Sequence, residues 1–311
     1  MANSLRDLRR KMKAIKSTKQ VTKAMELVAA SKMRRAVQNA VLLRTYAFTA
    51  WAILQKLALS HRGNHPWLAE RPVKKVLAIL VTSDRGLCGS LNTQLFRSVT
   101  QYIAATKELS GFEQLDFVAV GRKGQQFLSR SGQKVVAAFP ALSNHPSFKD
   151  VLPIAKIGID GFNDGAYSHV VLLYTEFLSA LLQEPATKVL LPFSESRLRE
   201  MIRDKFIRKR ITKEEEQTMG TVAKLAADYQ FEPSEEEVLN RILPQLTEMQ
   251  IYQAVLESTA SEHSARMVAM RNATDNASDI LSDLNLTYNQ TRQANITAEL
   301  AELSSAAAAL G

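Results

Sequence analysis

The chain begins and ends with long stretches that contain neither glycine nor proline, from Met1 to Arg62 and from Gln245 to Leu310. These two residues interrupt helices most strongly, so nothing in either stretch forbids a continuous helix. At about 1.5 Å per residue, each helix is roughly 90–100 Å long, two to three times the width of a compact domain. A rod of that length carries a narrow apolar stripe and needs a partner along its length. We expect each rod to pair with the other.

Heptad spacing in both stretches predicts a coiled coil. In the first stretch, small and apolar residues alternate in steps of four and three from Ala36 to Leu57, and similar spacing occurs from Leu5 to Ile15. In the last stretch one heptad register is kept throughout by Leu256, Ala260, His263, Met267, Met270, Thr274, Ala277, Leu281, Leu284, Tyr288, Thr291, Asn295 and Ala298. An open alternative is that both ends are ordinary amphipathic helices folded onto a globular core.

The positive charge is concentrated at the beginning of the chain. Between Met1 and Arg35, eleven Lys and Arg stand against Asp7 and Glu26, so this segment carries a charge equal to the formal net charge of +9. A basic helical end can bind nucleic acid, an anionic membrane surface or an acidic protein. No aromatic residue interleaves with these charges and no nucleic-acid-binding motif is present, which favours an acidic protein or a solvated face.

The residues between the rods predict an inserted α/β domain. Short Val- and Leu-rich runs indicate strands at Val73 to Thr82, Leu115 to Val120, Lys134 to Phe139 and His169 to Tyr174, with Lys188 to Leu191 as a further candidate. The segments Leu91 to Leu109 and Lys123 to Arg130 have helical patterns. This alternation is typical of a Rossmann-like, doubly wound domain with a parallel sheet and helices on its faces.

The loops that follow the first two strands lack the sequences that bind nucleotides. Ser83 to Ser90 contains neither GxxxxGK[ST] nor GxGxxG, and Gly121 to Gly124 also lacks a phosphate-binding sequence. We expect glycine to make tight strand-to-helix turns there, with Asp84 or Ser90 capping the following helix. The five histidines and the single Cys88 form no metal-ligand spacing. We predict no catalytic residue, no bound cofactor and no metal.

Four segments resemble the gamma subunit family of the F-type ATP synthase, in order along the chain. They are Lys23 to Met33 (KAMELVAASKM), Asp84 to Gly89 (DRGLCG), Ser261 to Asn276 (SEHSARMVAMRNATDN) and Tyr288 to Leu300 (YNQTRQANITAEL). The resemblance implies a non-catalytic subunit that is required in a proton-transporting ATP synthase. It also implies that the terminal helices form an antiparallel coiled coil inside a ring of three alpha and three beta subunits. The inserted domain would be a foot beside the epsilon subunit on the membrane c-ring.

The resemblance implies partner-contact roles for particular residues. Met25 would face an acidic segment of beta, with the cations Lys23, Arg34 and Arg35 nearby. Arg266, Gln293 and Thr297 would meet a loop of beta. Asp84, Arg85 and Gly86 are candidates for foot contacts, and Ser304 to Leu310 resembles a tip that turns in an apolar sleeve. Without the resemblance, each of these residues reads as an ordinary seam or surface position.

These observations divide the chain into a coiled-coil helix at 1–62, a Rossmann-like foot at 73–193, a charged insertion at 194–233 and a second coiled-coil helix at 234–311. The function implied is a central-stalk rotor at the cytoplasmic face of the bacterial plasma membrane. No apolar run is long enough to span a bilayer, and no nucleic acid is expected as a partner. The alternative is a coiled-coil adaptor or nucleic-acid-binding rod with a Rossmann-like head. The role of Ser194 to Gln230 is open.

Overall fold

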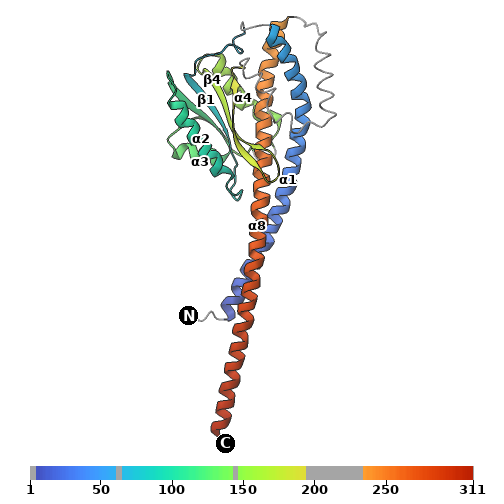
Figure 1. Cartoon of the computed structure of the whole chain (residues 1–311), viewed down its shortest axis with the longest axis vertical. Coiled ribbons are helices and arrows are strands. Elements are labelled where there is room, and N and C mark those ends of the chain that lie inside the picture. The colour runs from blue at the N-terminus through green and yellow to red at the C-terminus, as the bar shows by residue number, and fades with distance from the viewer. Residues whose placement is uncertain (1–4, 61–64, 143–145, 194–233, 311) are drawn as a thin grey trace. The chain divides into compact units, whose positions relative to one another are not determined.

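The computed structural model describes residues 5–60, 65–142, 146–193 and 234–310, with side chains except at 44–60, 235 and 307–310 (Figure 1). The chain packs as two units. The rod unit comprises Met1–Ser31 and Arg266–Gly311, and the sheet unit comprises Lys32–Ala265. Two long helices, α1 (Leu5–Ser60) and α8 (Glu235–Leu310), each contribute to both units. The continuous helices predicted from the absence of glycine and proline are confirmed.

Within the rod unit, α1 and α8 run antiparallel. The hydroxyl oxygens of Thr22 and Thr274 lie 2.8 Å apart, and Arg9 donates through Nε and Nη2 to the hydroxyl of Tyr288 at 2.8 and 2.6 Å. Residues earlier in α1 therefore contact residues later in α8, as an antiparallel pair requires. The Arg9 guanidinium also lies 5.4 Å from the centre of the Tyr288 ring, close enough for a cation–π interaction.

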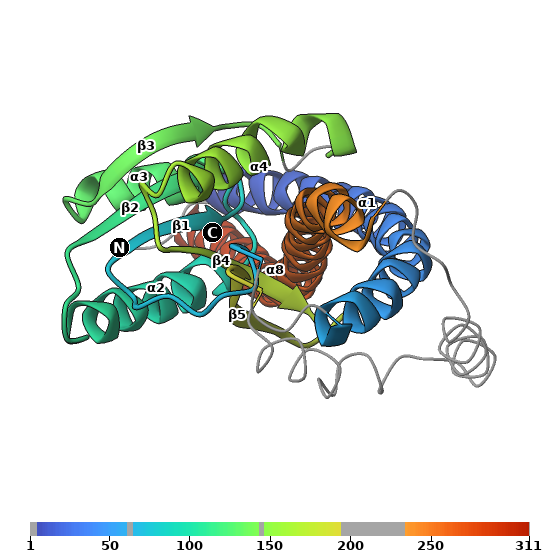
Figure 2. The same ribbon diagram turned by 90° about the horizontal axis from the view of Figure 1, so that it is seen from above.

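The sheet unit contains one five-stranded sheet in the order β3-β2-β1-β4-β5 (Figure 2). Its strands are β1 (Lys75–Val81), β2 (Gln114–Val120), β3 (Lys134–Phe139), β4 (His169–Phe177) and β5 (Gln183–Leu191). Its shorter helices are α2 (Leu91–Lys107), α3 (Arg122–Arg130) and α4 (Phe148–Asn163). The first four strands are parallel, which confirms the doubly wound domain. Strand β5 is antiparallel to β4 because a short turn joins them, and a parallel neighbour needs a long crossover.

The two faces of the sheet bury alternate residues of β1. Leu77 and Ile79 point toward α4 and the beginning of α8, whereas Ala78 and Leu80 point toward α2 and α3. Figure 1 shows α2 and α3 on one side of the strands and α4 on the other. Both faces are covered by helices, so the central strand β1 is apolar and buried from Val76 to Val81, as is typical of parallel sheets. The sheet unit is therefore a three-layer α/β fold.

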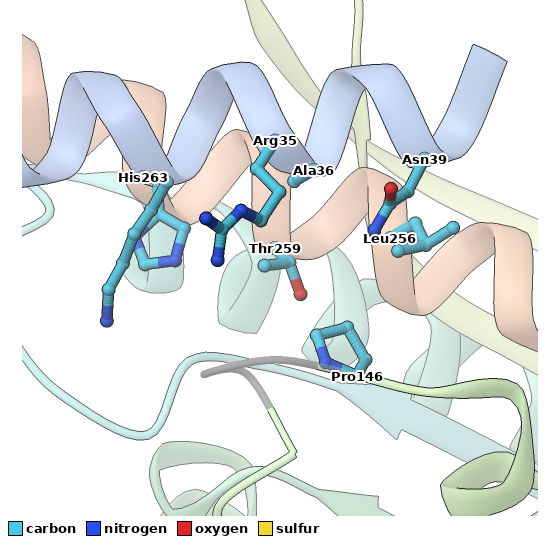
Figure 3. Close-up of a pocket in the computed structure, with 8 residues that line it drawn as sticks. Arg35, Ala36, Asn39, Pro146, Leu256, Thr259 and His263 are labelled. Atoms are coloured by element: carbon cyan, nitrogen blue, oxygen red, sulfur yellow. The ribbon is translucent and has the colours of Figure 1, made fainter. Parts of the chain in front are cut away.

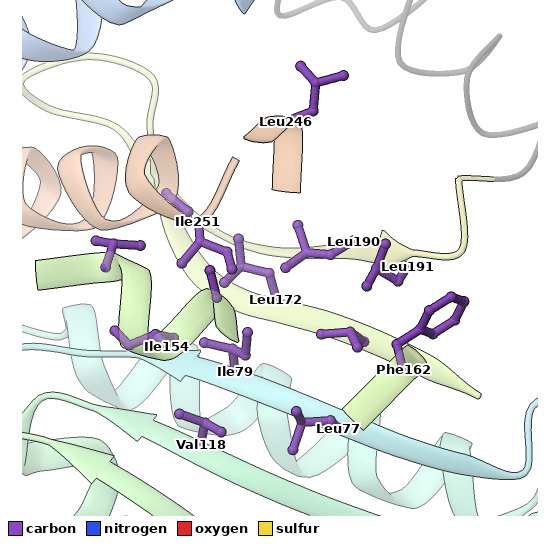
Figure 4. Packing of buried hydrophobic residues seen from close by; sticks show 14 of the residues in the cluster. Leu77, Ile79, Val118, Ile154, Phe162, Leu172, Leu190, Leu191, Leu246 and Ile251 are labelled. Atoms are coloured by element: carbon purple, nitrogen blue, oxygen red, sulfur yellow. The ribbon is translucent and has the colours of Figure 1, made fainter. Parts of the chain in front are cut away.

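Helix α8 completes the core of the sheet unit. Its residues Leu239, Leu243, Leu246 and Ile251 are buried with the sheet and with Ile154 of α4 (Figure 4). Each buried side chain of this size stabilises the fold by about 1.5–3 kcal/mol relative to the same side chain left in water. The beginning of α8 is therefore a core element of the sheet unit as well as part of a rod.

Polar contacts fix α8 at the end of β4. The hydroxyl of Ser261 donates to the carbonyl oxygen of Thr175 at 3.4 Å, and that of Ser264 donates to the carbonyl oxygen of Ala180 at 2.6 Å. Ser258 lies at the same place and accepts from the backbone N–H of Thr175. Buried backbone groups need such partners when strand pairing ends. The small hydroxyl side chains of this segment thus attach the helix closely to the strand.

Candidate partner-contact site

The buried faces of the two long helices follow the predicted heptads. In α1, every fourth or third residue is buried or half-buried, at Leu5, Leu8, Met12, Ile15, Lys19, Thr22, Glu26, Ala29, Met33, Ala36, Ala40 and Leu43. In the rod-unit part of α8 the same holds from Met267 to Thr291. The seam therefore continues through Lys19 and Glu26, two charged residues that interrupt the apolar pattern and hide it from a reading of the sequence. Ala47, Ala50, Leu54 and Leu57 lie outside the residues with described side chains.

The predicted seam is wrong beyond Thr291. Asn295 and Ala298 are exposed, as is every side chain described from Arg292 to Ala306. The physical reason is that the described part of α1 begins at Leu5, so this end of α8 has no paired helix among the described residues. Leu300 is 61% and Leu303 67% exposed, and with Ile296 they form an apolar stripe, hereafter the tip stripe. This stripe has heptad spacing but a different register from the seam.

Lys23 and Met25 lie on the rod-unit part of α1. The ammonium of Lys23 forms an ion pair with the carboxylate of Glu26 at 3.0 Å, and the Lys23 side chain is 54% exposed. Met25 is half-buried at the border of the seam. The Glu26 side chain is only 14% exposed, so water reaches this pair mainly from the Lys23 side. Lys23 is therefore accessible to a partner molecule, and Met25 is accessible in part.

An exposed apolar surface accompanies these residues, and the sequence reading did not single it out. Val21, Leu27 and Val28 are each more than half exposed. Val21 and Val28 are seven residues apart and therefore share one face of the helix. The sequence did contain a signal for this surface, since these three apolar residues stand among the Lys and Arg residues of α1. An apolar patch rimmed by charge is typical of a protein contact surface.

Arg34 and Arg35 are both exposed, but only Arg35 lines a pocket in the sheet unit. The pocket lies between α1, α8 and Pro146 (Figure 3). Consecutive residues of a helix point in directions about 100° apart, which explains why the two arginines differ.

The three residues predicted to meet one loop of a partner are not brought together. Arg266 is 8% exposed, whereas Gln293 and Thr297 are both exposed. Gln293 lies 27 positions after Arg266 on the same helix, a separation of roughly 40 Å. Gln293 and Thr297 are neighbours on one face, where the Thr297 hydroxyl donates to the Gln293 carbonyl oxygen at 2.9 Å. A single small loop can contact this pair, but not Arg266 as well.

Asp84 connects three loops at the carboxyl ends of the parallel strands. Its Oδ1 accepts the backbone N–H of Arg122 at 3.1 Å and that of Ala141 at 2.9 Å. Arg122 is the first residue of α3, so Asp84 caps that helix and not α2, which follows it in sequence. Ser90, the other candidate, makes no side-chain capping bond to α2. The prediction that Asp84 or Ser90 caps the following helix, α2, was therefore wrong. Asp84 caps α3, because the loops after neighbouring strands lie side by side.

Arg85 and Gly86 lie exposed in the turn that Asp84 anchors. At Gly86, an added Cβ would meet no atom within 4 Å. At Gly121 the situation is opposite, because its φ of 94° is left-handed and an added Cβ would collide with the carbonyl oxygen of Thr82. The glycine at the turn into α3 is therefore required for close backbone approach, as predicted.

The described residues were predicted to hold no metal ion. No group of three or more His, Cys, Asp or Glu among them is arranged to hold a metal ion. A buried polar cluster occurs at the amino ends of β2 and β3, where Asp116 accepts from Lys134 at 3.0 Å and from the Tyr167 hydroxyl at 2.9 Å. Burial, followed by this bond and the charge of Asp116, raises the pKa of Tyr167 to about 12. These groups connect strands to one another.

Comparisons with known proteins decide the family. A family model described as ATP synthase matches residues 4–310. The ATP synthase gamma chain of Herpetosiphon aurantiacus is 42% identical, and the alignment covers 99% of this chain and 99% of that protein. The gamma chain of Legionella pneumophila is 37% identical over 98% of this chain and 99% of that protein. The chain belongs to the ATP synthase gamma-chain family.

Solved structures agree with the gamma-chain fold. A chain of the central stalk and c-ring structure of Tetrahymena thermophila mitochondrial ATP synthase is 27% identical, with a TM-score of 0.57, covering 81% of this chain and 99% of that chain. A chain from the rotor of the Euglena gracilis mitochondrial enzyme has the same fold at 19% identity, with a TM-score of 0.59 and coverage of 94% and 98%.

A gamma chain is the central-stalk rotor subunit of ATP synthase and is not catalytic by itself, since catalysis lies in the beta subunits. This decides against the alternative of an adaptor or nucleic-acid-binding rod. None of the described helices combines the length and apolar character needed to cross a bilayer.

Proposed function

We propose that the rod unit of this gamma chain turns inside a ring of three alpha and three beta subunits. In this proposal the sheet unit is the foot that contacts the epsilon subunit and the membrane c-ring. The complex stands at the cytoplasmic face of a bacterial plasma membrane and is driven by protons. The family membership and the bacterial relatives support this arrangement.

The observation that carries the proposal is the exposed end of α8. From Arg292 to Ala306 every side chain is exposed, including the apolar tip stripe of Ile296, Leu300 and Leu303. A helix of this kind is marginal alone in water and gains stability from a partner that covers its apolar residues. An apolar sleeve formed by alpha and beta subunits fits this chemistry, and Gln293 and Thr297 at its entrance are positioned to meet a beta loop.

The second contact is the basic, partly apolar face of α1. Lys23 and Arg34 are exposed cations, and Val21, Leu27 and Val28 are exposed apolar side chains near them. An acidic and partly apolar segment of beta complements both features. Met25, half-buried and uncharged, would lie against that segment without favouring a particular rotary angle.

The third contact is the turn that Asp84 anchors. Asp84 fixes the turn to α3 and to the loop after β3, so Arg85 and Gly86 are presented on a rigid base. We expect this turn to be part of the foot surface that contacts the c-ring or epsilon. The insertion at Ser194 to Gln230, which lies outside the described residues, is a further candidate for such contacts.

Coupling follows from how these contacts change with rotation. The faces of α1 and α8 differ in charge and apolarity, so each rotary position presents a different surface to each beta subunit. A contact that differs in free energy between two states of beta shifts the equilibrium between them by that difference. Torque from the c-ring can thereby change the affinity of the beta subunits for nucleotide, although the gamma chain is not itself catalytic.

The test is assembly of tip-stripe variants with alpha and beta. Leu300→Asp with Leu303→Asp places charges where the sleeve would bury them, at a cost of several kcal/mol, and recovery of alpha and beta with the tagged chain should fall by roughly tenfold or more. Leu300→Met with Leu303→Met preserves apolar volume and should assemble normally. Because both positions are exposed in the chain, its helix content should be unchanged in either variant. Normal assembly of the Asp pair would contradict a buried tip.

The foot contact has its own test. Gly86→Leu adds a side chain into open space, so the variant chain should unfold at the same temperature as the wild type. If the turn packs against epsilon or the c-ring, the same change should reduce their recovery with the chain. Equal recovery of both partners would remove the turn from the contact surface.

A further inference from the structure

The sheet unit contains a pocket that the rotor function does not use. It has a volume of about 80 Å³ and opens to solvent between α1, α8 and Pro146. Its lining residues are Lys32, Arg35, Ala36, Asn39, Pro146, Leu256, Thr259 and His263. All of them belong to the sheet unit. Figure 3 shows the Arg35 side chain extending into the space between α1, His263 and Thr259.

The polar groups of this pocket are mainly hydrogen-bond donors. Lys32 and Arg35, one helical turn apart, carry cationic groups that only donate, and Asn39 and His263 offer an amide and an imidazole. The Thr259 hydroxyl donates to the Val255 carbonyl oxygen at 2.7 Å, so it can offer an anion only its lone pairs. Among the described lining residues there is no carboxylate. The lining is therefore positively charged at neutral pH.

Burial on one side strengthens the attraction for an anion. His263 and Thr259 are each only 4% exposed, and the apolar Ala36 and Leu256 are also buried. Water is thus excluded from the wall that α8 provides, and an opposite charge placed there is less screened than at an open surface. Charge-assisted hydrogen bonds from Arg and Lys to an oxyanion are about twice as strong as neutral ones.

The arrangement of donors favours an anion with several oxygen atoms. Lys32, Arg35 and Asn39 approach from α1, whereas His263 approaches from α8. A tetrahedral oxyanion can accept bonds from both directions at once, whereas a carboxylate has its two oxygens in one plane. We propose that this pocket binds a tetrahedral oxyanion of the phosphate class, which links α1 to α8 within the sheet unit.

The test is phosphate binding by the full chain at constant ionic strength, with chloride as the balancing anion. Titration calorimetry should show saturable binding of inorganic phosphate. Hydrogen exchange should slow at residues 32–39 and 256–263 when phosphate is bound. Arg35→Gln should weaken binding by about tenfold, as expected when a charge-assisted bond is lost.

Arg34→Gln is the matched control. It removes the same charge from the adjacent residue, which is exposed and does not line the pocket, and should change affinity by less than about twofold after screening by salt. A second variant, Asn39→Ala, should weaken binding without changing the net charge. Binding of ADP with the same dependence on Arg35 would assign a nucleotide phosphate as the source, and binding of phosphate alone would assign the free ion.

Three results would overturn the proposal. They are the absence of saturable phosphate binding, equal loss of binding in Arg34→Gln and Arg35→Gln, and protection of the helices by chloride as effectively as by phosphate. The first would show that the pocket holds no oxyanion. The other two would show that only general charge attraction operates. None of these outcomes bears on rotation, so the rotor function is tested separately.

Discussion

The hydroxyl groups of Thr22 and Thr274 lie 2.8 Å apart in the middle of the rod-unit seam. Both residues are more than nine-tenths buried, at 8% and 7% exposure. Each hydroxyl also lies near a carbonyl of its own helix, that of Lys19 at 3.0 Å and that of Met270 at 2.8 Å. A buried polar pair inside the seam fixes the register of the two helices, because a slipped pairing would separate the two hydroxyls.

Thr274→Val tests this pair. Valine has nearly the same shape but cannot bond to Thr22, so we expect a loss of about 1 kcal/mol in the free energy of unfolding of the rod unit. The double variant Thr22→Val with Thr274→Val should lose little more than Thr274→Val alone, because the bond between the two hydroxyls is already absent in the single variant. Chemical unfolding of all four proteins gives the coupling energy. Strictly additive effects would show that the hydroxyls do not interact.

Leu281→Pro tests the continuity of α8. Proline removes a backbone hydrogen bond and clashes with the preceding turn, at a cost of about 3 kcal/mol or more. We expect loss of exchange protection in the rod-unit part of α8, with the strands of the sheet unit still protected. Leu281→Met is the control and should keep both. If the proline variant assembles with alpha and beta and couples normally, the paired-rod account is wrong.

Asp84→Ala tests the link between the loops. Two backbone N–H groups, of Arg122 and Ala141, lose their acceptor, and we expect destabilisation of the sheet unit by about 1–3 kcal/mol. Arg85→Ala, one residue further in the same exposed turn, should change stability by less than about 0.5 kcal/mol. Urea unfolding measures both. Similar small effects would show that the bonds of Asp84 contribute little.

The raised pKa of Tyr167 predicts how the stability of the folded chain changes at alkaline pH. Its pKa is raised from 10.0 to about 12 in the folded chain, first by burial and then by its bond to Asp116. The unfolded tyrosine ionises near pH 10 while the folded one stays protonated, so stability falls as pH rises from about 10 to 12. Tyr167→Phe should flatten that part of the profile relative to the wild type. Identical slopes in this window would show that Tyr167 titrates normally.

Met25→Lys tests whether the basic, partly apolar face of α1 contacts beta during rotation. A lysine there adds a charge that can pair with an acidic segment of beta at one rotary position, and we expect fewer protons pumped per ATP hydrolysed in inverted vesicles. A partly desolvated pair worth about 1–3 kcal/mol would also raise the temperature dependence of turnover. Gln20→Lys adds the same charge at an exposed position of α1 and is the control. Unchanged pumping in Met25→Lys would remove this residue from the contact site.

The long helices and four of the five strands could be predicted because local pattern determines them. Uninterrupted helix-forming residues with heptad spacing, and short apolar runs bounded by turns, each have one preferred structure. Helix α4 carried a weaker signal, since it contains Pro153, Gly158 and Gly161. Gly158 is explained by packing, because an added Cβ would lie 3.2 Å from Val170 of β4, and such a contact is invisible before the fold is known.

The candidate contact site was less predictable, because it depends on where a helix loses its paired neighbour and on contacts between residues far apart in the sequence. The end of the seam at Thr291 depends on where α1 begins, and no residue near Asn295 signals it. The cap from Asp84 to α3 forms across parallel strands, although the residues are far apart in sequence. Resemblance to the family supplied the candidate contact residues, but it gave neither their separation along α8 nor the pocket beside Arg35.

Rotation of this chain relative to alpha and beta is the most direct test of its role as a rotor. A probe attached near the foot, with alpha and beta fixed to a surface, should turn in one direction while ATP is hydrolysed. A reversible cross-link between α8 and beta should stop both turning and hydrolysis, and its release should restore both. Continued ATP hydrolysis by the intact complex with a stationary probe would contradict the account.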